Sequence, residues 1–232
     1  MATYVLIHGA GSDAWYWHLV VPELRAAGND VVAPDLPCDD DSAGLAEYAD
    51  AVVDAIGERT GDIVVVAQSL GGFTAPLVCE RVPVSLLILV AAMVPAPGES
   101  PGDWWANTGW EEATREQGDR YGRPSDGNFD ARAVFFHDVP EEVVSEAFAR
   151  PQRSQSGTPF AKPWPLPAWP DVPTKFLLCR DDRFFPAEFM RRVVPERLGI
   201  TPDEMDSGHL PAFSHPKELA DRLEAYRIDA TN

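Results

Sequence analysis

Two short runs of the chain are apolar at nearly every position: DIVVVAQ over Asp62–Gln68 and VSLLILV over Val84–Val90. Strands of this kind are buried on both faces, which is typical of the centre of a parallel sheet covered by helices. Shorter β-branched runs predict further strands at Tyr4–His8, Asp30–Ala33, Thr174–Cys179 and Pro202–Met205. Helix-length segments lie between them, at Trp17–Ala27, Leu45–Ile56, Gly71–Arg81, Ala187–Val194 and Pro216–Tyr226. The alternation predicts an α/β fold with a doubly wound, mostly parallel six-stranded sheet.

The alternation stops between Val94 and Pro173. This stretch is rich in proline and contains five tryptophans, at positions 104, 105, 110, 164 and 169. A disordered linker would lack such rings, because burying each large apolar side chain contributes about 1.5 to 3 kcal/mol to folding. We therefore expect one domain, residues 1–232, with residues 95–172 forming an inserted cap of short helices.

The composition excludes several classes of protein. The chain has 37 acidic and 19 basic residues, so its formal charge is −18, which repels nucleic acids and anionic lipid surfaces. No apolar run reaches the roughly 20 residues that a membrane-spanning helix needs. Cys38, Cys79 and Cys179 are widely spaced and form no metal-binding pattern, which favours reduced thiols and a cytoplasmic location. The oligomeric state stays open, a homodimer included.

The turn after the first predicted strand, HGAGSDAW, allows two interpretations. Gly9, Gly11 and Ala14 match the G-x-G-x-x-A pattern of dinucleotide-binding folds, with Asp35 about 20 residues further on. Against this, the bulky rings of residues 15–17 stand where a helix would have to lie close to the strand. The other interpretation depends on residues further along the chain.

Ser69 lies in VVVAQSLGG, where a buried strand runs into a helix. Its neighbours at −2 and +2 are Ala67 and Gly71, and small residues there are what a sharp strand-to-helix turn requires. Such a turn presents the serine as a nucleophile at the start of a helix, whose dipole favours negative charge. The alternative interpretation of the same residues is that Ser69 is an ordinary serine that caps the N-terminus of the helix.

A serine nucleophile needs a base and an acid that orients the base. Among the five histidines, His209 in DSGHLP follows the last predicted strand and can reach the carboxyl edge of the sheet. The acid comes from RDDRFFP, where the distance to Pro186 favours Asp182 over Asp181. The order Ser69, Asp182, His209 is the chain order of the α/β-hydrolase fold.

The motifs HGAGSDAWYW, AQSLGG, RDDRFFP and GHLPAFSHP resemble the small esterase and hydroxynitrile-lyase branch of the α/β-hydrolase superfamily. The resemblance implies that the first turn is an oxyanion loop braced by His8, with the backbone N–H groups of Ala10 and Leu70 forming the oxyanion hole. It also implies that Gly9 lets the substrate approach, and that no metal or cofactor takes part.

Lyases of this branch carry a threonine directly after the first-strand histidine and a lysine directly after the catalytic histidine. Gly9 and Leu210 occupy these positions here, as in the ester-cleaving members. We therefore expect a serine hydrolase that cleaves carboxylic esters of small to medium, apolar or aromatic substrates through an acyl-enzyme. The residues expected to bind substrate are Gly9, Trp104, Trp105, Phe135, Phe136 and Trp164. The alternatives are a receptor-like or inactive member of the fold, or a hydrolase of C–C or amide bonds.

Overall fold

A computed structural model describes residues 1–121 and 130–230. All six strands are parallel and follow the order β2-β1-β3-β4-β5-β6, which confirms the predicted sheet. Their bounds are β1 Thr3–Ile7, β2 Asp30–Val32, β3 Ile63–Ser69, β4 Leu86–Ala92, β5 Thr174–Cys179 and β6 Asp203–Met205. The two apolar runs form β3 and β4, in which every residue is buried.

Helices cover both faces of the sheet because successive strand residues point to opposite sides. On one face Val5 and Val65 pack with α2 (Leu45–Ile56), α3 (Gly71–Cys79) and α9 (Ala187–Leu198). On the other face Tyr4 and Val64 pack with α1 (Val20–Ala26), α10 (Pro211–Ser214) and α11 (Pro216–Ala230). The first helix is preceded by a 3-10 turn, η1 (Ala14–Trp17). The doubly wound arrangement is therefore as predicted.

The chain order reverses at β1, because β2 pairs with one side of β1 and β3 with the other. In open α/β sheets, ligands bind beyond the carboxyl ends of the strands at such a switch point. The loops that follow β1 and β3 carry the first turn and Ser69, so the topology alone brings these two features together.

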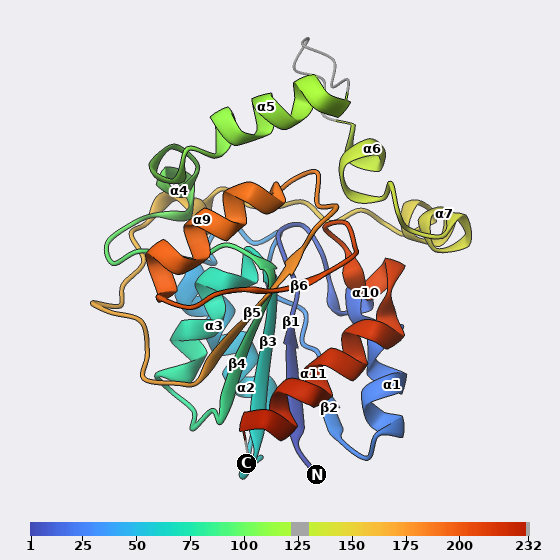
Figure 1. The fold of residues 1–232 in the computed structure, drawn as a ribbon. Coiled ribbons are helices and arrows are strands. Elements are labelled where there is room, and N and C mark those ends of the chain that lie inside the picture. The colour runs from blue at the N-terminus through green and yellow to red at the C-terminus, as the bar shows by residue number, and fades with distance from the viewer. Residues whose placement is uncertain (122–129, 231–232) are drawn as a thin grey trace.

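Between β4 and β5 the described residues form the helices α4 Pro101–Thr108, α5 Trp110–Tyr121, α6 Ala131–Phe135, α7 Glu141–Ala149 and α8 Thr158–Ala161. Figure 1 shows α5, α6 and α7 above the end of the sheet at which the strands finish. They lie at the carboxyl end of the sheet, the end at which the switch point is found, so this segment can cover a site there.

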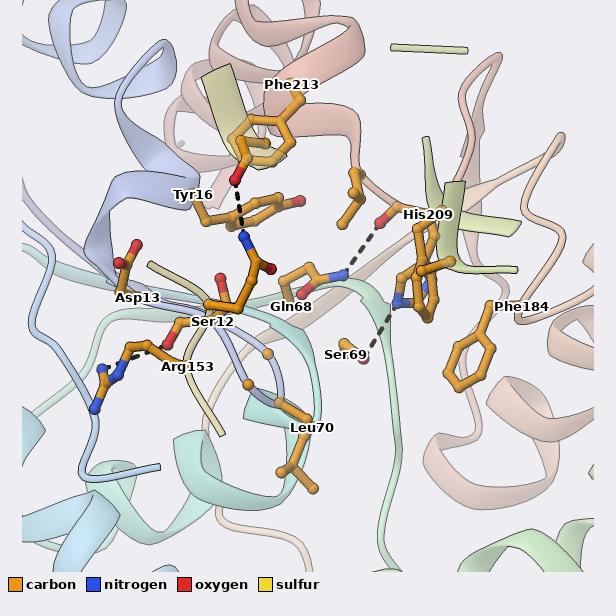
Figure 2. A pocket seen from close by; sticks show the side chains of 18 of the residues that line it. Ser12, Asp13, Tyr16, Gln68, Ser69, Leu70, Arg153, Phe184, His209 and Phe213 are labelled. Atoms are coloured by element: carbon orange, nitrogen blue, oxygen red, sulfur yellow. Dashed lines mark hydrogen bonds between the residues drawn. The ribbon is translucent and has the colours of Figure 1, made fainter. Parts of the chain in front are cut away.

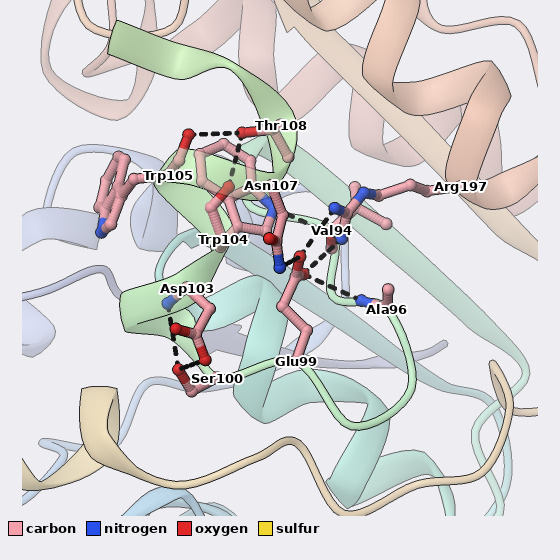
Figure 3. A network of polar contacts seen from close by, with 10 residues as sticks. All are labelled: Val94, Ala96, Glu99, Ser100, Asp103, Trp104, Trp105, Asn107, Thr108 and Arg197. Atoms are coloured by element: carbon pink, nitrogen blue, oxygen red, sulfur yellow. Dashed lines mark hydrogen bonds and ion pairs between the residues drawn. The ribbon is translucent and has the colours of Figure 1, made fainter.

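An ion pair joins this segment to the body of the molecule (Figure 3). Glu99 precedes α4, and its carboxylate pairs with Arg197 of α9 while accepting a hydrogen bond from Asn107. The side chains of Glu99 and Arg197 are only 4% and 14% exposed. The segment is thus attached at one end by a desolvated charge pair.

Within the described residues, no helix combines the length and the apolar character that spanning a membrane requires.

Candidate active site

Ser69 is the last residue of β3 and has a φ of 51°, in the left-handed region that side chains other than glycine seldom adopt. Helix α3 begins directly after this turn, where Gly72 has no room for a side chain and Gly71 has little. A Cβ on Gly72 would lie 1.9 Å from the carbonyl oxygen of Met93, and one on Gly71 would lie 3.2 Å from that of His8. The sharp turn of the predicted elbow therefore exists, and close packing against the ends of β1 and β4 enforces it.

The structure brings Ser69, at the end of β3, together with Asp182 and His209 from two loops at the carboxyl edge, and all three residues are buried. The Nε2 of His209 lies 3.2 Å from Ser69 Oγ (Figure 2). On the other side of the ring, its Nδ1 lies 2.7 Å from Asp182 Oδ2. A carboxylate can only accept, so the imidazole donates from Nδ1 and keeps the Nε2 lone pair for the serine hydroxyl. This is the arrangement in which His209 can remove the serine proton.

The surroundings of Asp182 explain why it, and not Asp181, meets the histidine. The N–H groups of Phe184 and Phe185 donate to Asp182 Oδ1 at 2.7 and 2.9 Å, which leaves Oδ2 for His209. Asp181 is exposed, and its backbone N–H bonds to the carbonyl of Ser207. The spacing to Pro186 in the sequence favoured Asp182, and Asp182 is the residue that is buried beside His209.

Gln68 also contacts this site, although no role was predicted for it from the sequence. Its side-chain nitrogen donates to the His209 carbonyl at 3.1 Å, and the side chain lies beside Ser69 in Figure 2. Its Oε1 also lies 2.6 Å from where a Cβ on Gly9 would be. The residue before Ser69 therefore touches both the histidine loop and the first turn, which only the folded chain reveals.

His8 holds the first turn through both ring nitrogens. Its Nε2 accepts the N–H of Leu36 at 3.1 Å, so Nδ1 carries the proton and donates to the Gly9 carbonyl at 2.8 Å. A Cβ on Gly9 would meet Ser69 Cβ at 2.9 Å, so the turn lies directly against the serine. Ala10 and Leu70, whose N–H groups the resemblance assigns to the oxyanion hole, both line the cavity that contains Ser69.

We expect His8 to make the stability of the protein depend on pH. Burial lowers its pKa below the ordinary value of 6.5, so the unfolded chain binds a proton that the folded chain resists. The free energy of unfolding should therefore fall as the pH drops below 6.5, by up to about 1.4 kcal/mol per pH unit from this group. Urea unfolding between pH 7.5 and 5 measures this slope, which His8→Gln should flatten. An unchanged slope in the variant would contradict the assignment.

A cavity of about 430 Å³ opens over Ser69 and His209. Aromatic rings contribute a large part of its lining, from Trp15, Tyr16, Trp105, Phe135, Phe136, Phe148, Phe160, Phe184 and Phe213. Polar side chains also line it, including Arg150, Gln152 and Arg153, and Arg153 donates to the Ser12 carbonyl of the first turn. Arg150 lies 4.7 Å from the centre of the Trp15 ring and bonds to Asp13 at 3.2 Å. Trp15, Phe148 and Phe213 were not among the predicted lining residues.

Two of the predicted lining residues lie elsewhere, and that expectation is corrected. Trp104 and Trp164 are fully buried in the core and do not line the cavity. Trp104 donates its ring N–H to the carbonyl of Val94, and Trp164 donates to that of Phe73. These bonds fix the segment to the chain after β4 and to α3, whereas Trp105, Phe135 and Phe136 line the cavity.

The residues of the dinucleotide pattern have other contacts in the fold. Asp35, which that interpretation assigns to a ribose, accepts a hydrogen bond from the N–H of Ala14 at 2.7 Å. The N–H of Gly11 donates to Gln155, at 2.8 Å. Backbone N–H groups of the first turn are therefore used in hydrogen bonds within the protein, and the turn packs on Ser69.

The chain is similar to known proteins over almost its whole length. The sequence profile described as the alpha/beta hydrolase family matches residues 4–222. A probable esterase, PIR7A, from Oryza sativa subsp. indica is 28% identical, with 95% of this chain and 94% of the relative covered. Methyl jasmonate esterase 1 from Vitis vinifera is 25% identical, with 95% of each covered. The crystal structure of a pyrethroid hydrolase from Sphingobium faniae JZ-2 superposes with a TM-score of 0.78 at 25% identity, covering 98% of each chain.

Proposed function

The chain belongs to the alpha/beta hydrolase family, and we propose that it is a carboxylic ester hydrolase for small to medium substrates with an apolar or aromatic group. The single observation that carries the proposal is the hydrogen-bonded series Ser69–His209–Asp182 at the base of an aromatic cavity. Similarity to proteins named as esterases over almost the whole chain supports it.

In the proposed mechanism Ser69 attacks the ester carbonyl while His209 Nε2 takes the hydroxyl proton. Asp182 stabilises the resulting imidazolium and holds its Nδ1 proton. His209 then returns a proton to the departing alkoxide, which leaves Ser69 acylated, and water activated by the same nitrogen releases the acid.

The N–H groups of Ala10 and Leu70 would stabilise the oxyanion that forms at each attack. Each such donor contributes about 3 to 4 kcal/mol to the transition state in comparable enzymes. The support comes from the position of both residues on the cavity wall beside Ser69, and from His8, which fixes the turn that carries Ala10.

The cavity supports the proposed substrate class. Its aromatic rings would bind an apolar acyl or alcohol group, and a volume of about 430 Å³ is within the range of small-molecule sites. Residues 95–172, proposed as the cap, would contribute Trp105, Phe135 and Phe136 to substrate binding. The reduced thiols of the three unpaired cysteines support a cytoplasmic enzyme.

A fluorophosphonate reagent tests the nucleophile, because it forms a stable adduct only with an activated serine. We expect intact mass spectrometry to show one adduct per chain, peptide mapping to place it on Ser69, and Ser69→Ala to lose it. A panel of p-nitrophenyl and methyl esters, with matched amides, then identifies the bond cleaved. A folded protein that is not labelled and hydrolyses no ester would instead indicate a receptor-like member of the family.

A further inference from the structure

The turn between α6 and α7 packs directly on the loop that carries His209. The ring of Phe135, at the end of α6, lies 5.2 Å from the His209 imidazole. Phe136 stacks with Phe213 of α10 at 6.2 Å. Asp138 lies in the chain between Phe136 and the buried Val139. Its carboxylate accepts a hydrogen bond from the backbone N–H of Gly208 at 2.6 Å. The segment that covers the cavity therefore holds the residue immediately before His209.

Gly208 is the residue that permits this contact. A Cβ built on it would lie 2.5 Å from Asp138 Oδ1 and 2.8 Å from His137 Nε2. Its φ lies outside the left-handed region, so backbone conformation alone does not require glycine here. The missing side chain allows the carboxylate to reach the backbone of the histidine loop.

Other groups on the histidine loop also face Asp138. Ser207 Oγ lies 3.5 Å and His215 Nδ1 4.0 Å from its Oδ2. Ser214 connects these two, with its Oγ 3.0 Å from Ser207 Oγ and 2.9 Å from His215 Nδ1. Among these groups the Gly208 N–H makes the short hydrogen bond, so Asp138 holds the loop chiefly through the backbone next to His209.

The backbone around His209 is consequently held from two sides. Gln68 donates to the His209 carbonyl, and Asp138 accepts the N–H of Gly208. Gln68 belongs to the sheet, whereas Asp138 belongs to the segment between β4 and β5. A displacement of about 1 Å at a reacting group can cost a hundredfold in rate, so an anchor of this kind bears on catalysis.

We propose that Asp138 is a positioning residue that aligns His209 with Ser69, so that the base is in place only when the segment over the cavity is docked. The inference rests on the proposed hydrolase function. Asp138 touches no reacting atom in this scheme, and it acts through Gly208 and the loop backbone.

Asp138→Ala and Asp138→Asn test the contact. On an ester that wild type hydrolyses, Asp138→Ala should lower kcat on the order of 10- to 100-fold and leave KM nearly unchanged. The rate constant for fluorophosphonate labelling should fall by the same factor, because it depends on the same base. Asp138→Asn keeps an oxygen acceptor for Gly208 and should stay within about threefold of wild type.

Asp130→Ala is the matched control. Asp130 also accepts backbone N–H groups, those of Arg132 and Ala133, but it caps α6 and does not contact the histidine loop. Its removal should lower the melting temperature while kcat stays near the wild-type value. Equal losses of kcat in Asp130→Ala and Asp138→Ala, or an effect of Asp138→Ala on KM alone, would overturn the proposal.

A signal from the histidine itself separates this inference from the function on which it rests. The proton between His209 Nδ1 and Asp182 should give a downfield proton resonance that weakens or shifts in Asp138→Ala and persists in Asp130→Ala. If wild type hydrolyses no ester, the function fails while this signal still reports on positioning. If esters are hydrolysed and the resonance is the same in both variants, the positioning role is wrong and the function stands.

Discussion

Asp182→Asn is expected to lower kcat by about four orders of magnitude, as the same change does in a comparable triad. The N–H groups of Phe184 and Phe185 both donate to Asp182 Oδ1, so in the variant they fix the amide oxygen at that place. The amide NH₂ then points at His209 Nδ1, which must accept. The imidazole proton moves to Nε2, and the atom that faces Ser69 can no longer take the serine proton.

The fold should survive this change because the bonds to residues 184 and 185 remain, so the melting temperature measures whether the variant is intact. Steady-state kinetics on the best ester gives kcat, and KM should change little. Asp181→Asn is the matched control, since this exposed neighbour does not contact the histidine. A variant at residue 182 that kept most of the wild-type kcat would show that His209 needs no carboxylate.

The central site could be predicted because its signals are local. Ser69 follows an apolar strand and lies between small residues, and the motifs around Asp182 and His209 each follow a strand of the same parallel sheet. The carboxyl ends of parallel strands meet at one edge, so the chain order was enough to place the three side chains near one another.

The lining of the cavity could not be predicted in the same way. Trp104 and Trp105 are neighbours in α4, and adjacent residues of a helix point about 100° apart, so one ring enters the core and the other faces the cavity. Which of them faces the cavity depends on how α4 docks. The contact from Asp138 to Gly208 crosses 70 residues and depends on the path of the covering segment, for which the sequence shows no periodic pattern.

The ends of helices were also hard to predict from local sequence patterns. The helix from Ala187 was predicted to finish at Val194, yet α9 continues through Pro195 to Leu198, although proline inside a helix is unfavourable. It ends at Gly199, whose φ of 67° is the left-handed conformation that terminates many helices. The burial of Val193 and Val194 against the sheet stabilises the helix across the proline.

The continuation of α9 has a consequence for stability, because it carries Arg197 to the carboxylate of Glu99. Arg197 also donates to the carbonyl of Val94, while Glu99 accepts from the N–H of Ala96 and from Asn107 (Figure 3). Both charges are therefore desolvated and satisfied by hydrogen bonds. Removing one partner of such a pair leaves the other charge buried without compensation, which is far more costly than removing an exposed one.

Glu99→Ala should accordingly lower the free energy of unfolding by about 3 to 5 kcal/mol. For a chain of this size, that corresponds to a fall in melting temperature of roughly 6 to 20 °C. Urea unfolding and calorimetry measure the two quantities. Asp221→Ala is the control, because it removes the acidic partner of Lys217 from an exposed ion pair. The side chains of Asp221 and Lys217 are 64% and 70% exposed, so this change should lower the free energy of unfolding by no more than about 1 kcal/mol.

Replacing both charges by apolar residues separates the cost of an unpaired cation from the loss of packing. Glu99→Leu with Arg197→Met should recover much of the stability lost in Glu99→Ala, because no buried charge remains. A double variant as unstable as Glu99→Ala would mean that the network stabilises the segment through shape and hydrogen bonds more than through charge. Equal stability of Glu99→Ala and wild type would instead show that Arg197 reaches water once its partner is gone.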